Sequence, residues 1–150
     1  MSDHVRKQIR DEFVTALTGL TTTGANCFAS RVRSLEDDAL PGITIHTDQE
    51  SIETDDESRI AREQIRTLTV SVVGHAKDAE SDIDDTLDTI AKEVETAVFA
   101  AFPSSTVGRV DLAEILTEFD AGAEQIVGRI TLEFLAGYIT SDGQPTIADG

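Results

Sequence analysis

The stretch "DALPGITIHTDQESIETDDESRIAREQIRTLTVSVVGH", residues 38–75, decides the fold. Apolar and polar residues alternate near both of its ends, over residues 43–47 and 63–75. A period of two is typical of a strand that packs one face, and Pro41-Gly42 marks a turn before the first strand. The residues between the strands, 48–62, are mostly charged or polar and predict a long acidic loop.

The longer of these strands has two different faces. One face is apolar and consists of Leu68, Val70 and Val72. The opposite face is polar and consists of Thr67, Thr69 and Ser71. One side is therefore expected to pack in a core, while the other faces water or a partner.

Amphipathic helices are expected on either side of this stretch. The first covers residues 3–20, where apolar residues recur at three- and four-residue steps: Val5, Ile9, Phe13, Ala16, Leu17 and Leu20. The second begins at the capping-box-like pair Ser81 and Asp84 and ends at Pro103. Its apolar stripe consists of Ile83, Leu87, Ile90, Val94, Ala97, Val98 and Ala101.

Three more strands complete the pattern. Residues 26–34 alternate with a period of two and predict a short strand after the first helix. Residues 110–119 and 125–140 predict a hairpin that turns at residues 120–122. The remaining residues, 141–150, have little apolar content and are expected to form a flexible tail.

The order of elements is helix, three strands, helix, two strands. Each helix has one apolar stripe and each strand one apolar face, so the economical arrangement places both helices on the same face of one sheet. We therefore expect an α+β fold with a mainly antiparallel or mixed sheet of about five strands. Residues 1–140 would form a single domain of ordinary size.

Charge sets the class of partner. The chain of 150 residues has 29 acidic and 12 basic residues, a net charge of -17, and such a surface repels nucleic acid. An acid-rich, lysine-poor composition is also typical of proteins from a salt-rich cytoplasm, which indicates a halophilic host. No apolar run is long enough for a membrane span or a signal peptide, so we expect a soluble, non-secreted protein without a membrane partner.

Neither the cysteine nor the histidines predict a reactive site. Cys27 is the only cysteine and is expected to pack as a small apolar side chain. The histidines His4, His46 and His75 are scattered among polar neighbours at no ligand spacing. No nucleophile elbow, phosphate loop or dinucleotide loop is present, so no catalytic residue and no cofactor is expected.

An acidic run at residues 82–88 has the superficial composition of a calcium loop. The sixth position of such a loop must turn sharply and is normally glycine, but here it is Leu87. The run also continues the apolar stripe of the second helix. We interpret it as a solvated helix start, where the helix dipole favours carboxylates, and expect no metal.

The order of these segments resembles the lambda-like tail terminator family, the minor tail protein U type of long-tailed viruses. The pieces that carry the resemblance are "CFASRVRS", "ALPGITIHT", the long polar segment, "REQIRTLTVSVVGHA" and the helix "DIDDTLDTIAKEVETAV", followed by a hairpin. It covers residues 3–140 and rests on the pattern of elements. No single invariant motif contributes to it.

The resemblance implies a structural protein of the virion without enzymatic activity. It would assemble as a homohexameric ring on the head-proximal end of the tail tube, stop polymerisation of the tube protein and provide the docking surface for the head-tail connector. Assembly would occur in the host cytoplasm. Viral DNA would pass through the ring without specific binding, because acidic walls repel phosphate.

The residues expected to contact neighbouring subunits or the tube come from the acidic segment and from the polar face of the sheet. They are Asp48, Glu50, Glu53, Asp55, Asp56, Glu57, Arg59, Arg62, Arg66, Thr67, Thr69, Arg129 and Glu133. Acids and arginines alternate along the loop, so acids of one subunit would meet arginines of the next. We expect the loop to be mobile in the isolated subunit and ordered on assembly.

Other functions stay open at this level. Another neck component, such as a tail-completion or head-tail joining protein, would have a similar small mixed fold and would also form rings. From different classes, a small acidic binding module for a basic partner would use the same charge, and the many carboxylate pairs leave a hydrolase open.

Overall fold

The computed structural model describes residues 3–29, 40–54, 62–121, 126–141, 143–146 and 148. In chain order its elements are α1 (Val5–Leu17), β1 (Cys27–Ala29), β2 (Gly42–Thr54), β3 (Glu63–Asp78), α2 (Ile83–Ala101), β4 (Arg109–Ala121) and β5 (Ile126–Ser141). The strands form one sheet in the order β1-β2-β3-β5-β4. Only β1 and β2 run parallel; the other neighbours are antiparallel. The expected α+β class is confirmed.

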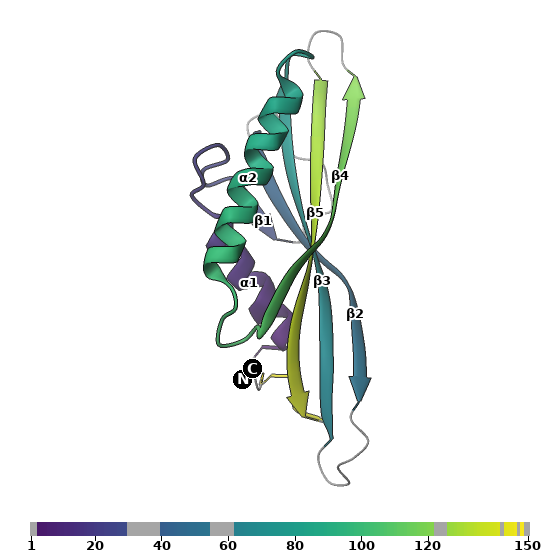
Figure 1. Ribbon diagram of the computed structural model, residues 1–150. Coiled ribbons are helices and arrows are strands. Elements are labelled where there is room, and N and C mark those ends of the chain that lie inside the picture. Colours follow the sequence, from purple (N-terminus) through teal and green to yellow (C-terminus); the bar gives the residue numbers. More distant parts are fainter. Residues whose placement is uncertain are drawn as a thin grey trace.

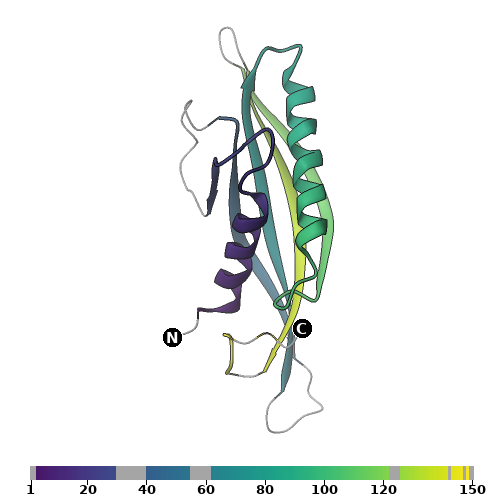
Figure 2. The ribbon, with the colours of Figure 1, turned by 90° about the vertical axis from the view of Figure 1, so that its left-hand side faces the viewer.

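Both helices lie on one face of the sheet (Figures 1 and 2). The helix α1 packs on β1 and β2, and α2 packs on β3 and β5. Figure 1 also shows the strong twist of the long strands, which carries the ends of β2 and β3 away from the helices. Among the described residues, no helix packs on the opposite face of the sheet.

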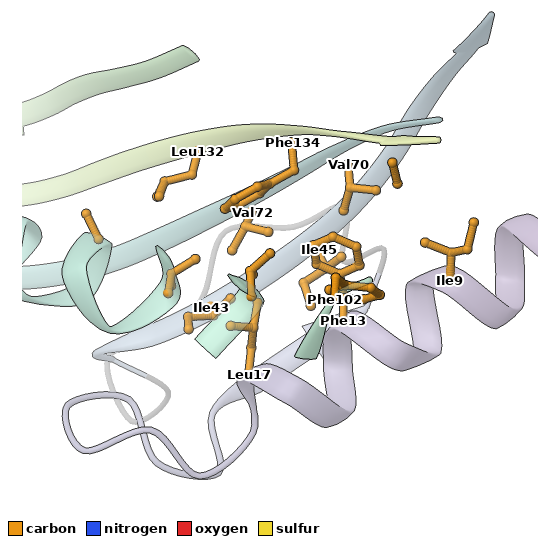
Figure 3. Close-up of a cluster of buried hydrophobic side chains, with 14 of the residues drawn as sticks. Ile9, Phe13, Leu17, Ile43, Ile45, Val70, Val72, Phe102, Leu132 and Phe134 are labelled. Atoms are coloured by element: carbon orange, nitrogen blue, oxygen red, sulfur yellow. The ribbon is translucent and has the colours of Figure 1, made fainter. Parts of the chain in front are cut away.

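The core forms where the stripe of α1 meets the sheet. Val5, Ile9, Phe13 and Leu17 recur every four residues and are fully buried, so they share one side of the helix. Figure 3 shows Ile9, Phe13 and Leu17 of this stripe against side chains of the sheet. The ring of Phe13 lies 4.7 Å from that of Phe102, between centroids. Each such buried side chain contributes about 1.5–3 kcal/mol to stability.

Two glycines of the sheet let α2 approach closely. A Cβ atom added at Gly74 of β3 would lie 2.6 Å from Cγ2 of Ile90, and one at Gly128 of β5 would lie 2.8 Å from Cδ1 of Leu87. Because both distances are shorter than van der Waals contact, a side chain at either position would push the helix outward.

The prediction of a loop over residues 48–62 is wrong for its first half. β2 continues to Thr54, past an irregularity between His46 and Gln49, and pairs with β3 from Gln49↔Thr69 to Thr54↔Gln64. Hydrogen bonds to β3 satisfy the backbone N–H and C=O groups of this polar stretch. The stretch extends beyond the helices and therefore needs no apolar side chains. Residues 55–61 lie outside the described residues.

Smaller differences concern the ends of the elements. Asp82 is the N-cap of α2 without a side-chain hydrogen bond, so the predicted capping box is wrong; Asp78 instead accepts from the Thr86 hydroxyl at 2.8 Å. Of the strand predicted at residues 26–34, residues 27–29 form β1 and residues 30–34 lie outside the described residues. The prediction of a turn at residues 120–122 is wrong for Asp120 and Ala121, which end β4 and pair with Val127 and Ile126, while residue 122 lies outside the described residues.

The segment after β5 contacts α1. The backbone N–H of Val5 donates to the carbonyl of Pro145 at 2.8 Å, and the Gln8 amide donates to the carbonyl of Thr146 at 3.0 Å. The first bond satisfies a free backbone N–H at the start of the helix, and the second adds a side-chain contact to the chain that follows the sheet.

Candidate interaction surfaces

The face of the sheet opposite the helices is half-buried and mixed in character. The register pairs Thr67 with Gly137, Thr69 with Leu135 and Ser71 with Glu133. Directly opposed residues project to the same side of a sheet, so Thr67, Thr69, Arg129 and Glu133 lie together on this outer face, as the sequence predicts.

The outermost strand, β4, is the most exposed part of the sheet. Three large apolar side chains on it are about half exposed: Ile115 at 45%, Leu116 at 51% and Phe119 at 47%. Leu116 opposes Thr131 and projects from the outer face, whereas Ile115 opposes Leu132 on the helix side. An edge strand of 13 residues with such side chains is a template for association unless another chain covers it.

Acidic side chains surround Leu116 on the outer face. Arg129 of β5 pairs with Asp120 at 2.7 Å and with Glu118 at 3.5 Å. Glu114 lies directly opposite Glu133, and within the described residues neither of these two carboxylates has an ion-pair partner. Two like charges at directly opposed positions destabilise a sheet.

Glu50 and Arg66, which the sequence places among the interface residues, lie inside the subunit. The guanidinium of Arg66 contacts the Glu50 carboxylate at 3.3 Å, and the two side chains are only 10% and 8% exposed. The Tyr138 hydroxyl donates to the other oxygen of Glu50, and Arg66 also donates to Thr140 at 3.0 Å and to Gln64 at 2.7 Å. Burial and the Glu50 carboxylate raise the pKa of Tyr138.

A basic groove of about 550 Å³ lies between the start of α1 and the irregular part of β2. The residues from the helix side are His4, Arg6, Lys7 and Arg10; those from β2 are His46, Thr47 and Asp48. Arg6 donates to the carbonyl of Thr47 at 2.8 Å, and Arg10 donates to its hydroxyl at 3.0 Å.

The charges in this groove are unequally neutralised. Lys7 is held by Asp3 at 3.0 Å and by Asp11 at 3.1 Å. Arg6 and Arg10, in contrast, contact no carboxylate among the described residues, and the buried Nε of Arg6 has no hydrogen-bond partner there. Two guanidinium groups without a carboxylate partner favour an acidic group from outside the chain.

A histidine cluster lies on the outer face of β2 and β3. The hydroxyl of Thr44 is 2.9 Å from Nε2 of His75 and 3.1 Å from Nε2 of His46. Burial lowers the pKa of His75 to about 4, and the charges of Arg129 and His46 add to the shift. His75 is therefore neutral at neutral pH.

The other predicted interface residues are dispersed. Asp48 lines the basic groove, while Glu53 is exposed on β2 and Arg62 is exposed just before β3. The predicted residues Asp55, Asp56, Glu57 and Arg59 lie outside the described residues.

The predicted set contains no residue of β4, and of the basic groove it contains only Asp48. The sequence contains a signal for the groove, because three of the first ten residues are basic in a strongly acidic chain. For β4 the sequence shows an apolar strand but not its position at the edge of the sheet.

Comparison of the chain with models of known protein families and with curated proteins finds no match. In the part of the chain that the structure describes, no helix has the length and apolar character needed to cross a membrane.

Proposed function

We propose that this chain is a structural, non-enzymatic subunit of a virus tail terminator. Copies of it would form a ring, a hexamer as the resemblance implies, that caps the head-proximal end of the tail tube. The ring stops polymerisation of the tube protein and presents a docking surface to the head-tail connector. The protein would be part of the virion and would assemble in the host cytoplasm.

The observation that carries this proposal is the exposed edge strand β4. Its apolar side chains and unpaired backbone groups favour contact with another protein chain over permanent exposure to water. The mixed outer face of the sheet, with Thr67, Thr69, Leu135 and Ile139 on it, provides further surface for neighbouring subunits or for the tube.

The charge of the chain supports the passage of DNA through such a ring. With a net charge of -17, a ring of several copies has a strongly negative surface, and carboxylates repel the phosphates of the DNA backbone. DNA would therefore slide through the ring without specific binding.

The test combines mass measurement with electron microscopy. The purified chain is mixed with tubes of the corresponding tail protein, and negative-stain images are scored for rings at one end of the tubes. Rings that cap one end and stop further growth are the expected result. A chain that stays monomeric and leaves tube growth unchanged contradicts the proposal, whereas a ring that binds the connector but not the tube assigns it to head-tail joining instead.

A substitution at the β4 edge connects this test to the structure. Leu116→Thr keeps a residue suited to a strand but removes the exposed apolar group, and each subunit contact should weaken by about tenfold if that group is buried on assembly. Ile52→Thr is the matched control, because Ile52 is 47% exposed on β2, away from β4. Equal loss of rings in both variants would argue against β4 as the contact.

A further inference from the structure

The described residues contain two sites of unbalanced charge that the fold keeps apart. The first is the pair Arg6 and Arg10 in the basic groove, which donates to Thr47 and contacts no carboxylate among the described residues. The second is the pair Glu114 and Glu133 on the outer face beside β4, where two carboxylates oppose each other. The arginine pair is positively charged and the glutamate pair is negatively charged, so each could neutralise the other.

These sites lie toward opposite edges of the sheet. The groove is bounded by β2, which follows β1 at one edge, and the glutamate pair spans β4 and β5 at the other. Figure 2 shows α1 on one side of the molecule and the strand β4 on the other. The two sites cannot meet within one subunit, but they can meet between two.

We propose that the basic groove of one copy binds the acidic β4 edge of the next copy, with Arg6 and Arg10 pairing with Glu114 and Glu133. This inference rests on the self-assembly in the proposed function and names its contact surfaces. Because the two surfaces differ, the contact is head-to-tail, and repetition of such a contact closes into a ring when the rotation between subunits permits.

The chemistry of the groove fits carboxylates. A guanidinium presents several N–H donors in a planar fork that matches a carboxylate, and Thr47 already holds both arginine side chains in place. At the other site, two arginines would remove the repulsion between Glu114 and Glu133. The exposed Leu116 next to them would be covered at the same time.

A second copy supplies this ligand in equal amount. Every subunit that offers a groove also offers a β4 edge, whereas a free phosphate ion would leave Glu114 and Glu133 unneutralised. The acidic residue in the groove, Asp48, lines it without pairing with Arg6 or Arg10. The groove therefore keeps a net positive charge on a strongly acidic protein.

Charge reversal tests the contact. Arg10→Glu places two acidic surfaces against each other, and Glu114→Arg places two basic surfaces against each other, so each variant alone should lose rings, with association weakened by about tenfold or more. Mixing the two variants should restore rings, because each groove then meets a β4 edge of opposite charge in strict alternation. The readout is oligomer mass by analytical ultracentrifugation.

Controls separate assembly from folding and from ion binding. Circular dichroism must show that both variants are folded, and Arg10→Gln with Glu114→Gln should give intermediate losses. Loss of rings in each single variant with recovery in the mixture supports the contact. Wild-type rings that persist in both variants overturn it but leave the proposed function intact. Inorganic phosphate that binds to the groove without dissociating rings also overturns it. A wild-type chain that forms no rings overturns both proposals.

Discussion

At the scale of single residues, Glu50 and Arg66 show how the partner of a charge depends on the fold. Both belong to polar, strongly charged sequence, and yet their side chains are among the least exposed charges of the subunit. Tyr138 and Gln64 complete their hydrogen bonding. A buried ion pair whose remaining donors and acceptors are satisfied is costly to break from one side, because the other charge stays buried.

Replacement of Glu50 should therefore destabilise the subunit strongly. Glu50→Ala leaves Arg66 with only neutral acceptors and should lower the free energy of unfolding by about 3 kcal/mol, and Tyr138→Phe should lower it by about 1 kcal/mol. Glu53→Ala is the control, since Glu53 is exposed on the same strand, and its effect should stay within about 0.5 kcal/mol. Urea denaturation at one protein concentration measures all three. Equal effects at Glu50 and Glu53 would contradict a buried network.

His75 gives the subunit a pH dependence at the same scale. Its pKa is lowered from the ordinary 6.5 to about 4 in the folded state, so between these values the unfolded chain binds more protons than the folded one. Stability should be fully present above about pH 6.5 and should fall as the pH drops toward 4. Because the ring is partly exposed, we expect a loss of about 1–2 kcal/mol instead of the full shift. The same titration with His75→Gln should give a shallower slope; an unchanged slope would assign the effect to other groups.

At the scale of elements, the packing of α2 depends on small residues in two strands. Periodicity predicts the helix and the strands but not how closely they approach. Gly74 is the tightest point, because its missing side chain leaves room for Ile90. Ile90 is branched at Cβ, so its Cγ2 atom cannot move away from position 74 unless the helix moves.

Gly74→Ala should accordingly cost about 1–3 kcal/mol of stability through overpacking. Gly137→Ala in β5 is the matched control. Its added Cβ would meet Arg109 at an ordinary 3.7 Å, and alanine restricts the unfolded chain, so this change should be neutral or slightly stabilising. Thermal unfolding compares the two. A similar melting temperature for both variants would mean that α2 does not rest on β3 as closely as described.

The strand β2 shows the limit of prediction for elements. Its first residues, Ile43 and Ile45, are buried and alternate as a strand should, and that part was predictable. The continuation through Glu50 to Thr54 carries charged residues with no packing signal, and it is a strand because β3 beside it extends equally far and supplies backbone partners. The tertiary structure decides which strand lies beside this segment, and the local sequence does not contain that information.

At the scale of the whole molecule, the distribution of charge matters more than its sum. A net charge of -17 predicts repulsion between copies, and added salt would screen it. Against this background, the basic groove at one edge and the acidic, partly apolar β4 edge at the other provide two local sites at which copies can attract each other. The proposed assembly should therefore depend on these two sites more than on the average surface.

The sequence by itself determined the class of fold, the order of its elements and the outer polar face, because periods of two and of three to four residues follow from the geometry of strands and helices. Only the tertiary structure decided which strand lies at the edge, which charges are buried together and which remain unpaired. These properties depend on contacts between residues far apart in the chain, such as Glu50 with Arg66 or Glu114 with Glu133, and the order of strands in a sheet sets those contacts.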